Sequence, residues 1–99
     1  MKILENKDDF KNIINKGKVV VDFYADWCGP CKMLGPVLEE FDKENNDVEV
    51  VKVNVDNFQD LAMEYKVMTI PNLIVFENGE VKNNSVGFID KDTLIDLVK

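Results

Sequence analysis

One stretch constrains the fold more than any other, because an apolar run ends at two cysteines and resumes at once with a helical period. The run Val19–Ala25 is rich in β-branched and aromatic residues and barely alternates, which is typical of a strand buried on both faces of a mainly parallel sheet. Apolar positions within Leu34–Phe41 fall three and four residues apart, and Pro30 suits the start of a helix, where its missing N–H is not needed. The stretch therefore predicts a buried strand that delivers Cys28 and Cys31 to the first turn of a helix.

The position of Cys28 at a helix entrance has chemical consequences. Unpaired backbone N–H groups and the positive end of the helix dipole favour an anion there, so we expect Cys28 to be the acidic, nucleophilic sulfur. Cys31 follows in the first helical turn, within reach of a disulfide without much backbone movement. Because the chain has no histidine and no third cysteine, a zinc site would need carboxylates to complete its four ligands. Redox chemistry is favoured over two structural thiols or half of a zinc site, and no metal is expected.

Length, charge and cysteine usage narrow the class of protein. The 99 residues and 45% apolar content suit one small globular domain over residues 1–99. Twelve Lys+Arg against 19 Asp+Glu give a net charge of −7, which disfavours nucleic acid and anionic membranes as partners. The N-terminus turns charged too early for a signal peptide, no membrane-spanning apolar run occurs, and one close cysteine pair favours a reducing compartment. We therefore expect a monomer in the cytoplasm.

Strand and helix patterns alternate along the rest of the chain. The expected elements are a strand at 2–4, a helix at 8–17, a strand at 19–25, a helix from 30 to about 44, a strand at 48–55, a helix at 58–65, strands at 72–76 and 81–86, and a helix from 90 to 98. Asn78-Gly79 predicts a tight hairpin between the last two strands. The order β-α-β-α-β-α-β-β-α predicts an α/β fold with a mixed sheet of about five strands and four flanking helices.

The motif Trp27–Lys32, which reads Trp-Cys-Gly-Pro-Cys-Lys, resembles the active site of the thioredoxin family. The resemblance implies the thioredoxin fold over almost the whole chain and a protein-disulfide reductase without a bound cofactor. In thiol–disulfide exchange Cys28 would attack a substrate disulfide and Cys31 would resolve the mixed disulfide, with Gly29 and Pro30 influencing the redox poise. The oxidised protein would be reduced again by a thioredoxin reductase that uses NADPH.

Two charged residues on predicted strands gain a role from the same resemblance. Asp22 interrupts the buried run, where an ionised carboxylate is costly unless its pKa rises or it finds a partner. The matching aspartate of thioredoxins lies beneath the dithiol and helps to deprotonate the second cysteine, so the resemblance assigns Asp22 this role toward Cys31. An edge position facing solvent is the alternative. Lys52 resembles the family's lysine near that aspartate and would offset its charge, although it also fits a solvated lysine.

Residues distant from the motif complete the expected site. Ile70-Pro71 resembles the family's cis-proline, which faces the dithiol; without this resemblance, a proline that merely starts a strand would be the favoured interpretation. Asn72 follows where the family commonly has threonine, a difference that bears on local hydrogen bonding and substrate preference. A flat, mostly apolar surface for docking extended protein segments is expected around Cys28. Its members would be Trp27, Gly29, Pro30, Ile70 and Gly87.

Two other functions fit parts of the sequence. An oxidant or isomerase of the same fold would differ in redox poise, and the Gly29-Pro30 pair and the lack of an export signal speak against it. A binding module would use the same apolar surface as a subunit or regulator of another protein, with incidental thiols. Activity that survives loss of both thiols would favour the binding module.

Overall fold

A five-stranded sheet forms the centre of the computed structural model, which describes residues 1–99. The elements are β1 (Lys2–Ile3), a short 3-10 helix η1 (Lys7–Asp9), α1 (Phe10–Ile14), β2 (Lys18–Tyr24), α2 (Gly29–Glu44), β3 (Val48–Asn54), α3 (Gln59–Glu64), β4 (Asn72–Glu77), β5 (Glu80–Val86) and α4 (Lys91–Leu97). The strand order is β1-β3-β2-β4-β5; β1, β3 and β2 are parallel, and β4 and β5 are antiparallel to their neighbours. The predicted α/β fold, its element order and its mixed sheet are confirmed.

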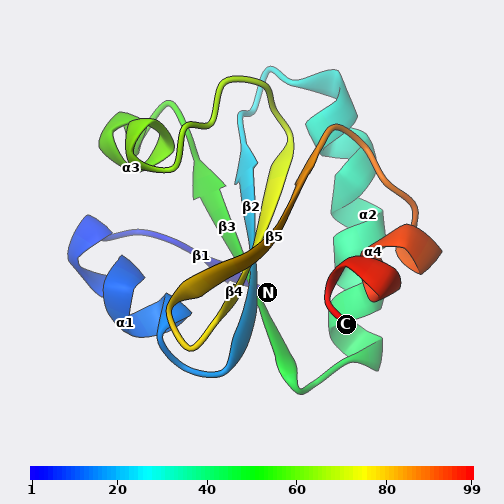
Figure 1. Cartoon of the computed structure of the whole chain (residues 1–99). Coiled ribbons are helices and arrows are strands. Elements are labelled where there is room, and N and C mark those ends of the chain that lie inside the picture. Colours follow the sequence, from blue (N-terminus) through cyan, green and yellow to red (C-terminus); the bar gives the residue numbers. More distant parts are fainter.

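Helices cover both faces of the sheet, with α1 and α3 on one face and α2 and α4 on the other (Figure 1). Strand β2 lies in the middle, paired with β3 on one side and β4 on the other, so both faces of the strand are buried. Val19, Val21 and Phe23 pack in the cluster under α1 and α3, whereas Val20 packs in the cluster under α2 and α4. Because strand side chains alternate, Asp22 points to the α2 side with Val20.

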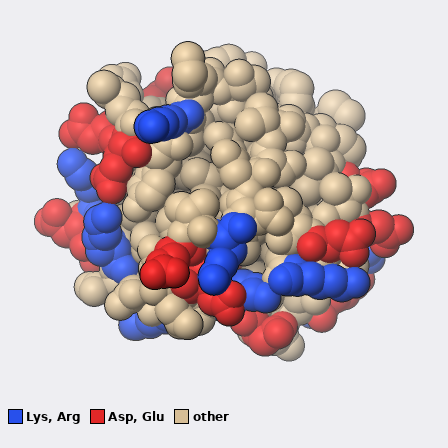
Figure 2. Space-filling view, viewed as in Figure 1, with Lys and Arg blue, Asp and Glu red and all other residues tan.

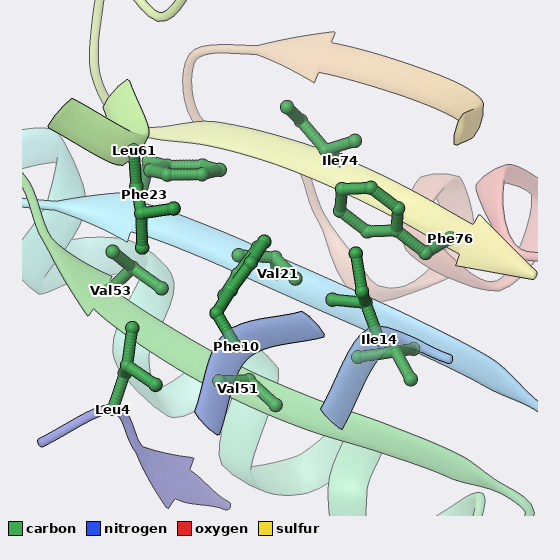
Figure 3. Close-up of a cluster of buried hydrophobic side chains, with 11 residues drawn as sticks. Leu4, Phe10, Ile14, Val21, Phe23, Val51, Val53, Leu61, Ile74 and Phe76 are labelled. Atoms are coloured by element: carbon green, nitrogen blue, oxygen red, sulfur yellow. The ribbon is translucent and has the colours of Figure 1, made fainter. Parts of the chain in front are cut away.

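The cluster under α1 and α3 joins three strands to both helices (Figure 3). Phe10 of α1 and Phe76 of β4 are fully buried, and their rings meet edge to face with centroids 6.1 Å apart. Burial of one such side chain contributes about 1.5–3 kcal/mol, so these rings are a main reason that a helix as short as α1 stays on the sheet. The cluster consists of Leu4, Phe10, Ile14, Val19, Val21, Phe23, Val51, Val53, Leu61, Ile74 and Phe76.

The cluster under α2 and α4 fixes the position of the longest helix. Leu34, Leu38 and Phe41 recur at helical spacing along α2 and are fully buried, as their spacing predicts. Leu94 of α4 packs in the same cluster, after a helix start at which the carboxylate of Asp90 accepts the backbone N–H of Thr93 at 2.9 Å. With α2 held in this way, its N-terminus lies at the carboxyl end of β2 (Figure 1).

The hairpin between β4 and β5 turns at the predicted residues. Asn78 and Gly79 have φ angles of 51° and 89°, the left-handed values that a tight two-residue hairpin requires at both positions. The N–H of Gly79 donates to the carbonyl of Ile14 at 3.0 Å, which ties the turn to the end of α1. No helix combines the length and the apolar character that crossing a membrane requires.

Candidate active site

Cys28 occupies the N-cap of α2, one residue before the helix begins. Its backbone is extended (φ −91°, ψ 113°), and its carbonyl accepts the N–H of Lys32 at 3.2 Å, the first helical hydrogen bond. The N–H of Cys31 points at the Cys28 Sγ, 3.3 Å away. Gly29 and Pro30 are the first two helical residues, where a backbone N–H has no partner within the helix and a proline costs nothing. The sulfur therefore sits where backbone donors and the helix dipole favour negative charge.

Cys28 and Cys31 form a disulfide across the first turn of α2, with their Cα atoms 5.3 Å apart. Each residue is only 5% exposed, and with Ala25 they form a small apolar cluster against which Ile70 packs. Since the Cα distance already suits the bond, the disulfide can open and close with little movement of the backbone. No group of three His, Cys, Asp or Glu side chains lies together as a metal-binding set.

The segment before β4 faces the disulfide. The Ile70–Pro71 peptide bond is cis, and the carbonyl oxygen of Ile70 lies 3.8 Å from the Cys28 Sγ. The N–H of Gly87, at the end of β5, donates to the carbonyl of Pro71 at 2.7 Å. Gly87 has φ +93°, a conformation that favours glycine. The fold thus brings Ile70, Pro71 and Gly87 to the end of the sheet where Cys28 lies.

Asp22 is 1% exposed, so the alternative of a solvent-facing edge position is wrong. Burial raises the pKa of Asp22 to about 7, and the positive charge of Lys52 opposes this rise in part. One carboxyl oxygen, Oδ1, has no hydrogen-bond partner. A buried carboxyl that titrates near neutrality is suited to accept and return a proton.

Lys52 is the register partner of Asp22 on the neighbouring strand β3. Its side chain is half-buried, so it is neither fully solvated nor enclosed. The Nζ lies 4.4 Å from the centroid of the Tyr24 ring. Tyr24, Lys52 and Cys31 line one hollow beside the disulfide.

The expected docking surface contains one aromatic side chain held by a hydrogen bond, and two further apolar side chains close to it in sequence are exposed. Trp27 is 70% exposed, and its indole N–H donates to the carboxylate of Asp56 at 2.9 Å. Met68 (93% exposed) and Phe88 (43% exposed) lie close in sequence to Ile70 and Gly87, respectively. Charged side chains in Figure 2 gather on the left side, up to the upper left, and along the lower edge, whereas the upper right, where α2 begins in Figure 1, is largely uncharged.

The fold and this site define a protein that carries out thiol–disulfide exchange, and comparisons with known sequences identify the family. The thioredoxin family profile matches residues 1–99. The chain is 43% identical to the thioredoxin of Mycoplasmoides gallisepticum over 100 residues, which cover 100% of both chains. It is 52% identical to the thioredoxin of Bacillus subtilis over 85 residues, which cover 85% of this chain and 82% of the relative.

Solved structures agree with the sequence comparisons. A mutant thioredoxin from Halobacterium salinarum has a TM-score of 0.90 at 40% identity, covering 98% of this chain and 86% of the other. The thioredoxin of Plasmodium falciparum has a TM-score of 0.91 at 31% identity, covering 99% and 96%. The chain belongs to the thioredoxin family. It is a thiol–disulfide oxidoreductase that works through Cys28 and Cys31, and the family implies disulfide-bearing substrates and a reductase partner.

Proposed function

We propose that this chain is a protein-disulfide reductant in which Cys28 is the attacking thiol and Cys31 the resolving thiol. The observation that carries this proposal is the Cys28 Sγ at the N-cap of α2, with the Cys31 N–H 3.3 Å away. After reduction, the same N–H and the helix dipole stabilise a Cys28 thiolate. A thiol of moderately lowered pKa suits a reductant near neutral pH, because it combines a large thiolate fraction with retained nucleophilicity.

The exchange reaction balances in two steps. The Cys28 thiolate attacks one sulfur of the substrate disulfide, which forms a mixed disulfide and releases the other substrate sulfur as a thiolate. Cys31 then loses its proton and attacks the Cys28 Sγ, which restores the Cys28–Cys31 disulfide and releases the second substrate sulfur. Two electrons pass from the protein to the substrate, and the leaving thiolates take up protons.

Asp22 is proposed as the group that accepts the proton of Cys31. Its burial on the α2 side of β2 and its pKa of about 7 support this role, because a carboxyl that titrates near the working pH accepts and releases protons readily. Lys52 is proposed as a supporting residue, since its positive charge limits the rise in the pKa of Asp22.

Trp27, Ile70 and Gly87 are proposed to dock the substrate. An extended substrate segment that pairs with the backbone at Ile70 would bring its disulfide to Cys28, because the Ile70 carbonyl is 3.8 Å from the Cys28 Sγ. Pro71 supports this edge through the hydrogen bond that its carbonyl accepts from Gly87.

The partner and setting follow from the family. We propose that residues 1–99 act as one monomeric domain in the cytoplasm, without a bound cofactor, and that a thioredoxin reductase drawing on NADPH restores the dithiol. The thioredoxin relatives and the absence of any third cysteine support this assignment. The net charge of −7 supports solubility without oligomerisation.

The proposal is tested by reduction of insulin disulfides coupled to NADPH oxidation through a bacterial thioredoxin reductase. We expect turnover with the parent protein and none with Cys28→Ser or Cys31→Ser. Only Cys31→Ser should accumulate a mixed disulfide with insulin, because its attacking thiol is intact and its resolving thiol is absent. A mixed disulfide formed only by Cys28→Ser would reverse the two roles, and the absence of turnover with the parent protein would favour a binding module.

A further inference from the structure

The hollow beside the disulfide contains a charged side chain whose position the exchange reaction does not explain. It is lined by Tyr24, Ala25, Asp26, Cys31, Lys32 and Lys52. Asp22 and Lys52 are register partners on β2 and β3, and strand alternation directs both side chains to the α2 face. A buried carboxyl with a lysine as its immediate neighbour is the usual setting for an ion pair.

Lys52 makes no ion pair with Asp22. The ion pairs of the chain join other residues, and the Asp22 Oδ1 has no hydrogen-bond partner. Instead, the Lys52 Nζ lies 4.4 Å from the centroid of the Tyr24 ring, within the distance at which a cation is attracted by an aromatic face. Tyr24 is two residues beyond Asp22 on the same face of β2. The ring and the carboxyl are therefore two alternative sites for one flexible ammonium group.

The position of the ammonium group decides how Asp22 titrates. A cation within about 4–6 Å of a carboxylate lowers its pKa by about 1–3 units. With Lys52 at the ring, burial outweighs the lysine's charge, and the pKa of Asp22 is raised to about 7. The register partner of Asp22 on β4 is apolar Leu73, and the charge of Asp22 also acts on the Tyr24 hydroxyl, whose own pKa is raised, chiefly by burial. Asp26 and Lys32 are the other charged residues that line the hollow.

We propose that Tyr24 is a positioning residue: its ring holds the Lys52 ammonium away from Asp22. The carboxyl then remains free to bind and release a proton near neutral pH, which is the property that its role toward Cys31 requires. This inference rests on the role proposed above for Asp22.

Carbon-13 NMR titration of the Asp22 carboxyl in the oxidised protein tests the inference, because no thiol titrates in that state. Tyr24→Phe keeps the ring and should leave the Asp22 titration midpoint within a few tenths of a pH unit of the parent. Tyr24→Leu removes the ring, so Lys52 can approach the carboxyl, and the midpoint should fall by about one unit or more. In a Lys52→Met background, Tyr24→Leu should produce no such fall.

An unchanged midpoint in Tyr24→Leu, or an equal fall with and without Lys52, would overturn the inference. A second measurement covers the case in which Tyr24→Leu does not fold. The Lys52 side-chain protons next to Nζ should be shifted upfield by the ring in the parent and in Tyr24→Phe, and shifts typical of a free lysine in both would overturn the inference. Failure of the proposed role of Asp22 is recognised separately, as an unchanged rate of insulin reduction at neutral pH in Asp22→Asn.

Discussion

At the scale of single residues, Asp22 couples the chemistry of the site to the stability of the fold. An aspartate in the unfolded chain ionises near pH 3.9, whereas burial raises the pKa of Asp22 in the native state to about 7. The native state therefore holds a proton between these values that the unfolded chain has already lost. The free energy of unfolding therefore falls as the pH rises from about 4 to about 7, and it stays at this lower value above pH 7.

Replacement of Asp22 by asparagine should remove this dependence on pH. A shift of about three pKa units corresponds to about 4 kcal/mol, so the stability gained by Asp22→Asn should grow by up to about 4 kcal/mol between pH 4 and pH 8. Urea unfolding of the oxidised parent and variant at the two pH values measures the gain. An equal difference at both pH values would mean that Asp22 titrates alike in the native and unfolded states.

At the scale of elements, two glycines in open space show how local backbone geometry sets the cost of a side chain. Gly35 lies inside helix α2, directly before Pro36, and Gly17 connects α1 to β2 with φ +70°. A Cβ added at either position meets no atom within 4 Å. The same substitution at the two sites therefore differs mainly in its backbone conformation.

Gly35→Ala should stabilise the protein by up to about 1 kcal/mol, because alanine favours a helix interior over glycine, although the following Pro36 offsets part of this gain. Gly17→Ala should destabilise it by about 1–2 kcal/mol, because a Cβ is strained in the left-handed region. Urea unfolding of the two oxidised variants, each compared with the parent, measures the effects. The same sign in both would show that backbone conformation does not control the outcome.

At the scale of the whole molecule, the sheet order predicts a gradient of local stability. Strand β2 has a hydrogen-bonded neighbour on each side and buried side chains on both faces, whereas β5 is an edge strand with mostly exposed side chains. Native-state hydrogen exchange should find the slowest amides in β2 and much faster exchange in the amides of β5 that bond to β4. Strand β4, which is also flanked on both sides, is the internal control and should resemble β2. Equal protection in β5 and β2 would contradict this gradient.

Short-range patterns in the sequence predicted most of the fold. The run Val19–Ala25 matches β2 within one residue at each end, and Asn78-Gly79 forms the expected hairpin turn. These features depend on neighbouring residues alone, since hydrophobic period and turn chemistry are local properties. The position of Cys28 at the N-cap of α2 followed in the same way, from a strand pattern that ends just before a helical one.

Contacts between distant residues could not be read from the sequence. Alternation along a strand says which side chains share a face, but it does not say which strands are neighbours. The hydrogen bond between Trp27 and Asp56 therefore had no local signal. The contact between Tyr24 and Lys52 had only a partial signal in the sequence. Alternation gives the face of its own strand on which each side chain lies, but the two faces can be matched only when β2 and β3 are known to pair.

The acidity of the Cys28 thiol is the property on which the whole proposed reaction depends. Titration of reduced Cys31→Ser, followed by the ultraviolet absorbance of the thiolate, measures this acidity with a single cysteine present. The midpoint should lie at least one unit below the value of about 8.5 for a free cysteine, and it should return to that value when the variant is unfolded in urea. A folded-state midpoint at or above about 8.5 would contradict the stabilisation of a thiolate by the N-terminus of α2.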